Sequence, residues 1–175
     1  MVSSLLYVAK PKLSDLKEAR DIFKMNYYKN GGSLLVKSVA PSLFNMRNIL
    51  LIKRSINKNS KPKVIGYIHF VHNLKRDKKD TLYYGASWND NNVYIAQIAL
   101  LNEFKGHGIA SQLIDHTLKQ HCRGKDVYAH VNVENIKSRN LLNRFGFKVI
   151  GVYTPKGDYH GKSNYKALIY HKYMV

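Results

Sequence analysis

Apolar positions along the chain repeat with two different periods. Short apolar runs rich in β-branched and aromatic residues predict strands at 5–9, 48–55, 63–71, 92–101, 125–133, 148–153 and 165–175. Three segments instead repeat their apolar positions every three or four residues and predict helices at 15–29, 109–121 and 135–147. Residues 33–46 are ambiguous and fit a second, short helix. The order β-α-(α)-β-β-β-α-β-α-β-β predicts an α/β fold with a mixed sheet, and 175 residues fit a single domain over 1–175.

The composition adds a strong basic charge to this picture. The 29 Lys and Arg residues outnumber 11 Asp and Glu residues, which gives a formal net charge of +18. Such a charge favours anionic partners, including a polyanionic cofactor or RNA. A solvated basic surface without a ligand explains the same charge, because the basic residues are spread along the chain.

Other features bear on the cell compartment. No apolar run approaches the roughly 18 residues of a spanning helix, and the first residues lack the pattern of a signal peptide. Cys122 is the only cysteine, so no internal disulfide is expected. The simplest expectation is a cytoplasmic protein that binds no membrane. A homodimer is left open.

A glycine turn separates the most apolar strand, 92–101, from the helix predicted at 109–121. Gly106 and Gly108 leave room for an anion beside the unpaired amides of a helix N-terminus. An ordinary glycine-containing turn fits this spacing equally well. A Rossmann turn would need a third glycine at Ser111, and the P-loop pattern is absent.

Three motifs in sequence order resemble the GNAT superfamily of acyl-CoA-dependent N-acetyltransferases. The segment from Lys105 to Ala110, KGHGIA, is similar to the family signature Q/R-x-x-G-x-G/A, with Lys at the first position. Asn135 opens a helix that ends in Gly146-Phe147, as the family's second motif does. The run VIGYIHF looks like the family's third strand. The resemblance implies a GNAT-like mixed sheet whose two central strands splay apart.

The resemblance also implies a site for acetyl-CoA. The backbone of Ile98, Ala99 and Leu100 would pair with the pantetheine arm, and the Leu100 amide would hold the oxyanion. Asn135 would hydrogen-bond the arm, with Ser138 or Arg139 reaching the arm or the phosphates. The pyrophosphate would lie on the glycine turn, formed by Lys105, Gly106, His107, Gly108, Ile109, Ala110 and Ser111.

Two positions depart from the family pattern. Leu142 stands where the family often has the tyrosine that protonates the leaving thiolate. Ala96 and Gln97 stand where many members carry an acidic residue, although Gln97 could still position the substrate or a water. The general acid and base therefore remain unassigned. The 13 tyrosines of the chain offer substitutes, including Tyr153, Tyr159, Tyr165 and Tyr170, and the sequence does not choose among them.

The resemblance places the acceptor site near residues 24–40, 75–91 and 153–165, which are rich in aromatic residues and lysine. These walls suit an amine on a polar or anionic small molecule or macromolecule better than a polycation. Two alternatives stay open. One is an enzyme that acetylates aminoacyl-tRNA, as toxin members of the superfamily do, and the other is a non-catalytic module that binds acyl-CoA or RNA. No metal is expected, because the histidines do not fit a ligand motif.

Overall fold

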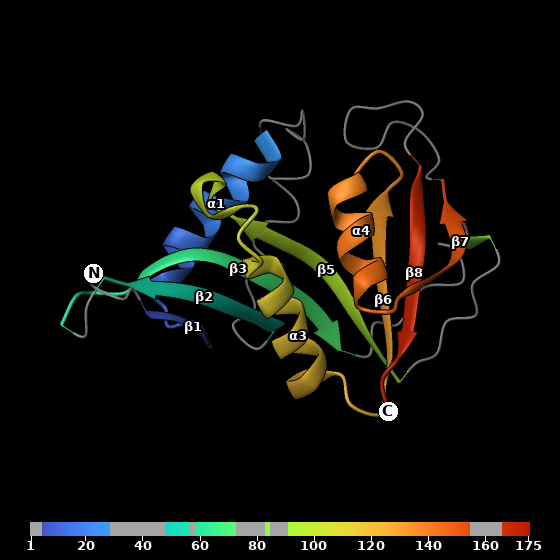
Figure 1. Cartoon of the computed structure of the whole chain (residues 1–175), viewed down its shortest axis with the longest axis horizontal. Coiled ribbons are helices and arrows are strands. Elements are labelled where there is room, and N and C mark those ends of the chain that lie inside the picture. Colours follow the sequence, from blue (N-terminus) through green and yellow to red (C-terminus); the bar gives the residue numbers. More distant parts are fainter. Residues whose placement is uncertain (1–4, 29–47, 57–58, 73–82, 85–90, 155–165) are drawn as a thin grey trace. The chain divides into compact units, whose positions relative to one another are not determined.

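The computed structural model describes residues 5–28, 48–56, 59–72, 83–84, 91–154 and 166–175 (Figure 1). Its strands are β1 (Leu5–Ala9), β2 (Ile49–Ser55), β3 (Lys63–His72), β4 (Tyr83–Tyr84), β5 (Asn92–Leu100), β6 (Asp126–Asn132), β7 (Lys148–Tyr153) and β8 (Ala167–Tyr173). Its helices are α1 (Asp15–Tyr28), the 3₁₀ helix η3 (Asn102–Phe104), α3 (Ile109–His121) and α4 (Ile136–Arg144).

These strands follow the order β1-β2-β3-β5-β6-β8-β7-β4 in the sheet. The β5–β6 pair is parallel, whereas β1–β2, β2–β3, β6–β8, β7–β8 and β4–β7 are antiparallel. The sheet is therefore mixed, which confirms the predicted fold class. The chain forms two compact units, 1–69 with 97–117 and 70–96 with 118–175, and β3, β5 and α3 run through both.

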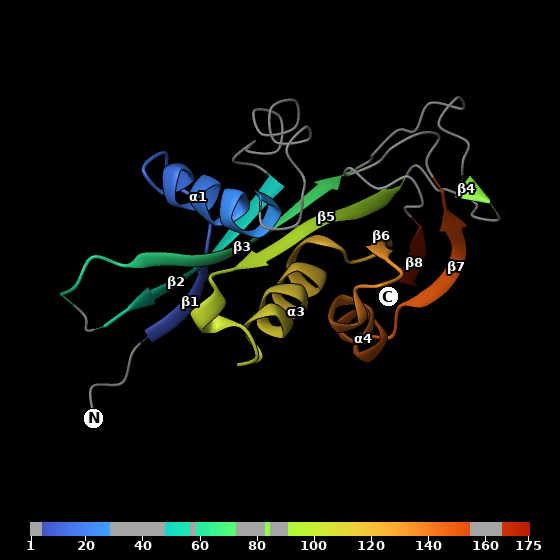
Figure 2. The same ribbon diagram turned by 90° about the horizontal axis from the view of Figure 1, so that it is seen from above.

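In the first unit, α1 and the first part of α3 cover opposite faces of its strands (Figure 2). Apolar side chains fill both interfaces, with Ala19 and Phe23 of α1 at most 2% exposed and Leu113 of α3 fully buried. Polar contacts also fix α1. The Glu18 carboxylate accepts a 2.8 Å hydrogen bond from the Val64 amide of β3. The helix therefore has a defined position over the strands that lead into the predicted cofactor site.

In the second unit, α4 packs on one face of β6 and β8 (Figure 2). This face is apolar, and its buried residues include Val127, Ala129 and Tyr170 on the strands and Leu142 on the helix. β6 and β8 pair over seven residues, from Asp126 opposite Tyr173 to Asn132 opposite Ala167. This pairing determines which side chains of β6 and β8 lie side by side on the opposite face of the two strands.

The predicted elements agree closely with those observed. The helix side predicted for 109–121 is buried, since its members Ile109, Leu113, Ile114, Thr117 and Leu118 are at most 4% exposed. The two-residue strand β4 was not predicted. The second helix expected at 33–46 lies outside the described residues.

Candidate active site

The glycine turn lies between the end of β5 and the start of α3. η3 follows β5 directly, and Gly106 and Gly108 then adopt φ angles of 87° and 76°. This left-handed conformation strains most other residues, which explains the glycines locally. An added Cβ at either position would meet nothing within 4 Å. The turn therefore leaves open space at both glycines, as an anion site requires.

The N-terminal end of α3 directly follows the glycine turn. The Gln112 amide donates to the Gly108 carbonyl at 3.1 Å, which is the first hydrogen bond along this helix. The amides of residues 109–111 therefore have no acceptor within the helix, and the helix dipole favours an anion there. His107 is exposed beside them. The pyrophosphate cradle predicted from the sequence would consist of these groups.

Lys105 braces this turn against α1. Its ammonium donates to the amide oxygens of Asn26 at 2.9 Å and Asn102 at 2.7 Å. Asn26 in turn donates to the carbonyl of Leu100, at 3.1 Å. A side chain predicted to meet the phosphates thus also ties α1 to the end of β5.

The end of β5 presents alternate backbone groups to β3. The Leu101 amide donates to the Ile65 carbonyl of β3 at 2.9 Å. Because successive residues of a strand direct their amides to opposite edges, the amides of Leu100 and Ile98 face away from β3, and that of Ala99 faces toward it. Leu100 thus has the orientation expected for the oxyanion donor.

Gln97 and Tyr67 form a hydrogen-bonded pair nearby. The buried Tyr67 hydroxyl donates to Gln97 Oε1 at 2.5 Å, which fixes the Gln97 carboxamide. Its amide group then keeps two N–H donors to offer. This geometry suits the predicted role of Gln97 in positioning a substrate or a water.

The second-motif residues have structural partners on α4. Asn135 is the N-cap, and its Oδ1 accepts a 3.1 Å hydrogen bond from the Ser138 amide. The Arg139 guanidinium donates to the Val133 carbonyl at 2.8 Å. Leu142, at the family's tyrosine position, is buried and contributes no proton donor. The predicted cofactor residues of α4 are therefore ordered by the helix cap.

Comparisons with known proteins identify the family of this chain. The sequence profile of the acetyltransferase (GNAT) family matches residues 17–147. The chain belongs to the GNAT acetyltransferase family. No curated protein has a significantly matching sequence.

Solved GNAT structures share the fold at low sequence identity. A GNAT family acetyltransferase from Bacillus cereus is 16% identical, with 98% of this chain and 99% of that chain covered and a TM-score of 0.67. Arabidopsis thaliana NAA60, solved with a bisubstrate analogue, is 17% identical, with 97% and 98% covered and a TM-score of 0.67. A putative acetyltransferase from Acinetobacter baylyi reaches a TM-score of 0.72 at 12% identity, with 98% and 94% covered.

The structure of this chain also contains a polar cluster that the sequence analysis did not predict. Tyr94 of β5 and His130 of β6 approach each other, with the Tyr94 hydroxyl 3.3 Å from Nδ1 of His130. The ring of Tyr153 on β7 stacks on His130, with 5.6 Å between centroids and planes 6° apart. Tyr153, one of the candidate tyrosines, thus lies in a polar cluster. Strand alternation was the only signal that could have grouped the three residues.

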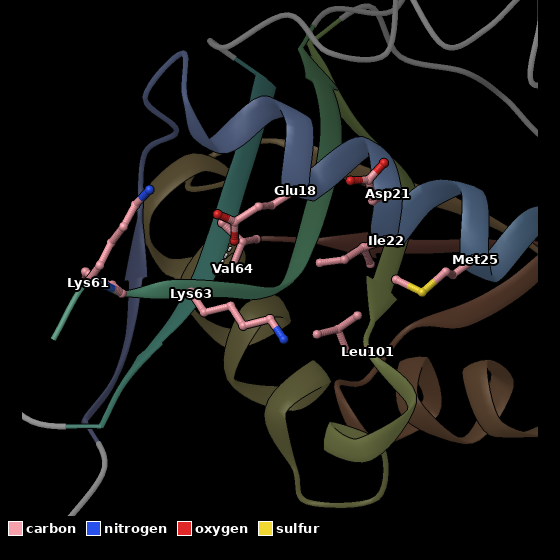
Figure 3. A pocket seen from close by; sticks show the side chains of 9 residues that line it. Glu18, Asp21, Ile22, Met25, Lys61, Lys63, Val64 and Leu101 are labelled. Carbon is pink, nitrogen blue, oxygen red and sulfur yellow. Dashed lines mark hydrogen bonds between the residues drawn. The ribbon is translucent and has the colours of Figure 1, made fainter.

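A groove of about 450 Å³ opens between α1 and the start of β3 (Figure 3). Its apolar lining comes from Ile22, Met25, Pro62, Val64 and Leu101, and its polar lining from Glu18, Asp21, Lys61 and Lys63. Glu18 points to the Val64 amide rather than into open space, as Figure 3 shows. The groove carries charges of both signs and was not predicted.

Three further features concern the residues that the structure describes. No three His, Cys, Asp or Glu side chains in that part of the chain gather as metal ligands. Cys122 is buried, and burial raises the pKa of its thiol to about 12, so it is a poor nucleophile. No helix in the described ranges is both long and apolar enough to span a membrane. Most of the predicted acceptor walls, at 29–40, 75–82, 85–90 and 155–165, lie outside the description.

Proposed function

We propose that this protein transfers an acetyl group from acetyl-CoA to a primary amine by direct attack on the thioester. The observation that carries the proposal is the glycine turn. Gly106 and Gly108 hold positive φ angles with open space beside them, immediately before the N-terminal turn of α3. A pyrophosphate can approach such a backbone closely because no side chain stands in the way.

Most of the proposed catalysis is positioning. A neutral amine held against the thioester carbonyl reacts as if it were highly concentrated. The Leu100 amide, which faces away from β3, would donate to the oxygen that gains negative charge. Gln97, fixed by Tyr67, would orient the amine or a water. These are roles for groups already held by the fold.

A charge-reversal pair tests the donor site. Gly108→Asn and Gly108→Asp have nearly the same shape, and both residues tolerate a positive φ better than most. Asn reports only the loss of open space, while Asp adds a negative charge beside the pyrophosphate. We expect Asp to weaken acetyl-CoA binding at least about tenfold more than Asn does, or about 1.4 kcal/mol.

The measurement is thermal stabilisation of wild type and both variants over a titration of acetyl-CoA. Equal stabilisation of the Asp and Asn variants would show that no phosphate lies at this turn. In wild type, the amine requirement is tested by release of free thiol from acetyl-CoA. Binding without thiol release on any amine would favour the non-catalytic module.

The same thiol assay compares acceptor classes. It includes free amino acids, a peptide with a free N-terminus, spermidine, an aminoglycoside and aminoacyl-tRNA. The net charge of +18 favours polyanionic acceptors such as aminoacyl-tRNA, whose binding would weaken steeply with salt. A polyamine or aminoglycoside as the best acceptor would contradict the expectation of a polar or anionic one.

A further inference from the structure

The strand β1 lies at an edge of the sheet and exposes apolar side chains on both of its faces. It pairs with β2 on one side, and no other strand in the described part of the chain pairs with its outer side. Leu5, Leu6 and Tyr7 are 49%, 40% and 40% exposed, although successive residues of a strand point to opposite faces. Every residue of β2 except Arg54 is buried, by contrast. Packing within the chain therefore does not account for the apolar sequence of β1.

This edge also lacks the features that usually protect an exposed strand. Natural edge strands carry charged residues, proline or a bulge, because these prevent pairing with another chain. The β1 sequence LLYVA contains neither a charge nor a proline. Its ladder with β2 runs without a bulge from Leu5 opposite Ser55 to Ala9 opposite Leu51. The outer edge of β1 is therefore regular, uncharged and able to pair with an added strand.

The charge of the molecule indicates which partner fits this strand. Two copies of a chain with a net charge of +18 repel each other unless the surfaces that meet carry little charge. Lys53, opposite Tyr7 on β2, forms an ion pair with Asp15 at 2.7 Å. The guanidinium of Arg54 lies over the ring of Phe104, 5.4 Å from its centroid. A partner attracted by the positive charge would be acidic and would gain nothing at an uncharged strand, whereas a second copy requires one.

A two-fold axis fixes how two copies of β1 can pair. In an antiparallel ladder, two opposite residues either both direct their backbone groups toward the partner strand or both direct them away. For identical strands, the axis must therefore pass through a residue, and an axis at Tyr7 pairs all five residues of β1. The resulting pairs are Leu5 with Ala9, Leu6 with Val8 and Tyr7 with its own copy. Every pair is apolar.

The same arrangement separates the nearest lysines. Lys10 follows β1 and is exposed. With the axis at Tyr7, Lys10 is three residues from the axis in each copy, and the two lysines lie ~20 Å apart along the strands. This distance exceeds the Debye length of about 8 Å at physiological ionic strength, so their repulsion is largely screened. Parallel pairing would instead place the two Lys10 side chains next to each other.

We propose that this protein forms a two-fold homodimer in which β1 of each copy pairs antiparallel with β1 of the other, with the axis at Tyr7. Each copy contributes the same surface, as in other two-fold dimers. Pairing removes the apolar side chains of Leu5, Leu6 and Tyr7 from water and joins the β1 edges of the two copies. The dimer does not depend on the acetyl transfer proposed above.

Sedimentation of the full chain over a range of protein concentrations tests the dimer. The wild-type mass should rise with concentration toward twice the 20.2 kDa of one chain. Tyr7→Glu places two carboxylates opposite each other at the axis and should raise the dissociation constant at least about tenfold. Val149→Glu is the matched control, because Val149 is also an apolar strand residue and is 48% exposed. It should leave the dissociation constant unchanged.

Two cysteine variants test the register under mild oxidation. Opposite residues of an antiparallel pair lie within the Cα–Cα range of a disulfide, so Tyr7→Cys should cross-link two copies. The two Leu5 positions lie roughly 14 Å apart, and Leu5→Cys should cross-link at least about tenfold less. The native Cys122 is fully buried and should not compete.

Three results would overturn the proposed dimer. They are a wild-type monomer at every concentration, an unchanged dissociation constant in Tyr7→Glu, and equal cross-linking of the two cysteine variants. If Tyr7→Glu fails to fold, the cysteine pair still decides, because neither cysteine introduces a charge.

Discussion

At Gly66 the backbone of β3 lies close to that of β5, and Gly66→Ala tests that contact. A Cβ at this position would lie 2.8 Å from the Ala99 carbonyl oxygen and 3.2 Å from Cγ2 of Ile52, and would also collide with the end of the Leu100 side chain. The Leu100 side chain can rotate away. The Ala99 carbonyl cannot, because it belongs to the strand backbone.

The expected cost of Gly66→Ala follows from this crowding. A methyl group forced into a packed core typically costs about 1–3 kcal/mol, and contacts on both sides of Gly66 place it near ~2 kcal/mol. For a chain of this size, that lowers Tm by roughly 4–8 °C. Because the relief must come from β5, the Leu100 amide should shift as well. A misplacement of several tenths of an ångström at an oxyanion donor should lower kcat at least about tenfold.

The assay combines urea unfolding with thiol release from acetyl-CoA. Gly124→Ala is the control, since Gly124 has a φ of 66° and nothing within 4 Å of an added Cβ. It should cost about 1 kcal/mol through backbone strain alone and leave kcat unchanged. Wild-type stability of Gly66→Ala would refute the close approach of the strands. Lost stability with wild-type kcat would refute the role of the β5 backbone in catalysis.

Two buried charge features give further predictions. His69 is 4% exposed, and burial lowers its pKa to about 4. The stability that its neutral form contributes is therefore complete above about pH 6.5 and is lost as the pH falls toward 4. Urea unfolding should show about 2 kcal/mol less stability from His69 at pH 5 than at pH 7, and His69→Leu should remove this pH-dependent difference. Burial opposes ionisation of Asp15, but its hydrogen bond with Lys53, at 2.7 Å, prevails and holds the pKa of Asp15 below its usual value. Asp15→Asn should cost about 3 kcal/mol in urea unfolding, because it leaves the Lys53 ammonium buried and uncompensated. If the Asp15→Asn/Lys53→Met double variant is as unstable as Asp15→Asn alone, this cause is contradicted.

Local sequence patterns predicted much of the fold. The strand and helix positions agree within a few residues because the apolar period of a segment depends on neighbours in sequence. The glycine turn was predictable for the same reason, since positive φ angles at Gly106 and Gly108 are a local requirement. β4 escaped prediction because two residues are too short to show a period.

Long-range contacts were not visible in the sequence. Lys105 looked like a phosphate ligand, and only the folded chain shows that it also binds Asn26 of α1, 79 positions away. Nothing in the sequence near Tyr94 indicates His130, 36 positions later, as its partner. Such pairs arise from strand register, which is set by many pairings at once.

The sequence by itself identified the family and predicted where the donor would bind, because a short glycine turn between a strand and a helix has the same backbone requirements wherever it occurs. Tertiary structure decided which side chains meet across the parallel pair β5–β6 and the neighbouring strands. The separate strands β5, β6 and β7 bring Tyr94, His130 and Tyr153 together through their pairing and alternation. A side chain's neighbours across a sheet depend on register, and register is a property of the whole sheet rather than of any one strand.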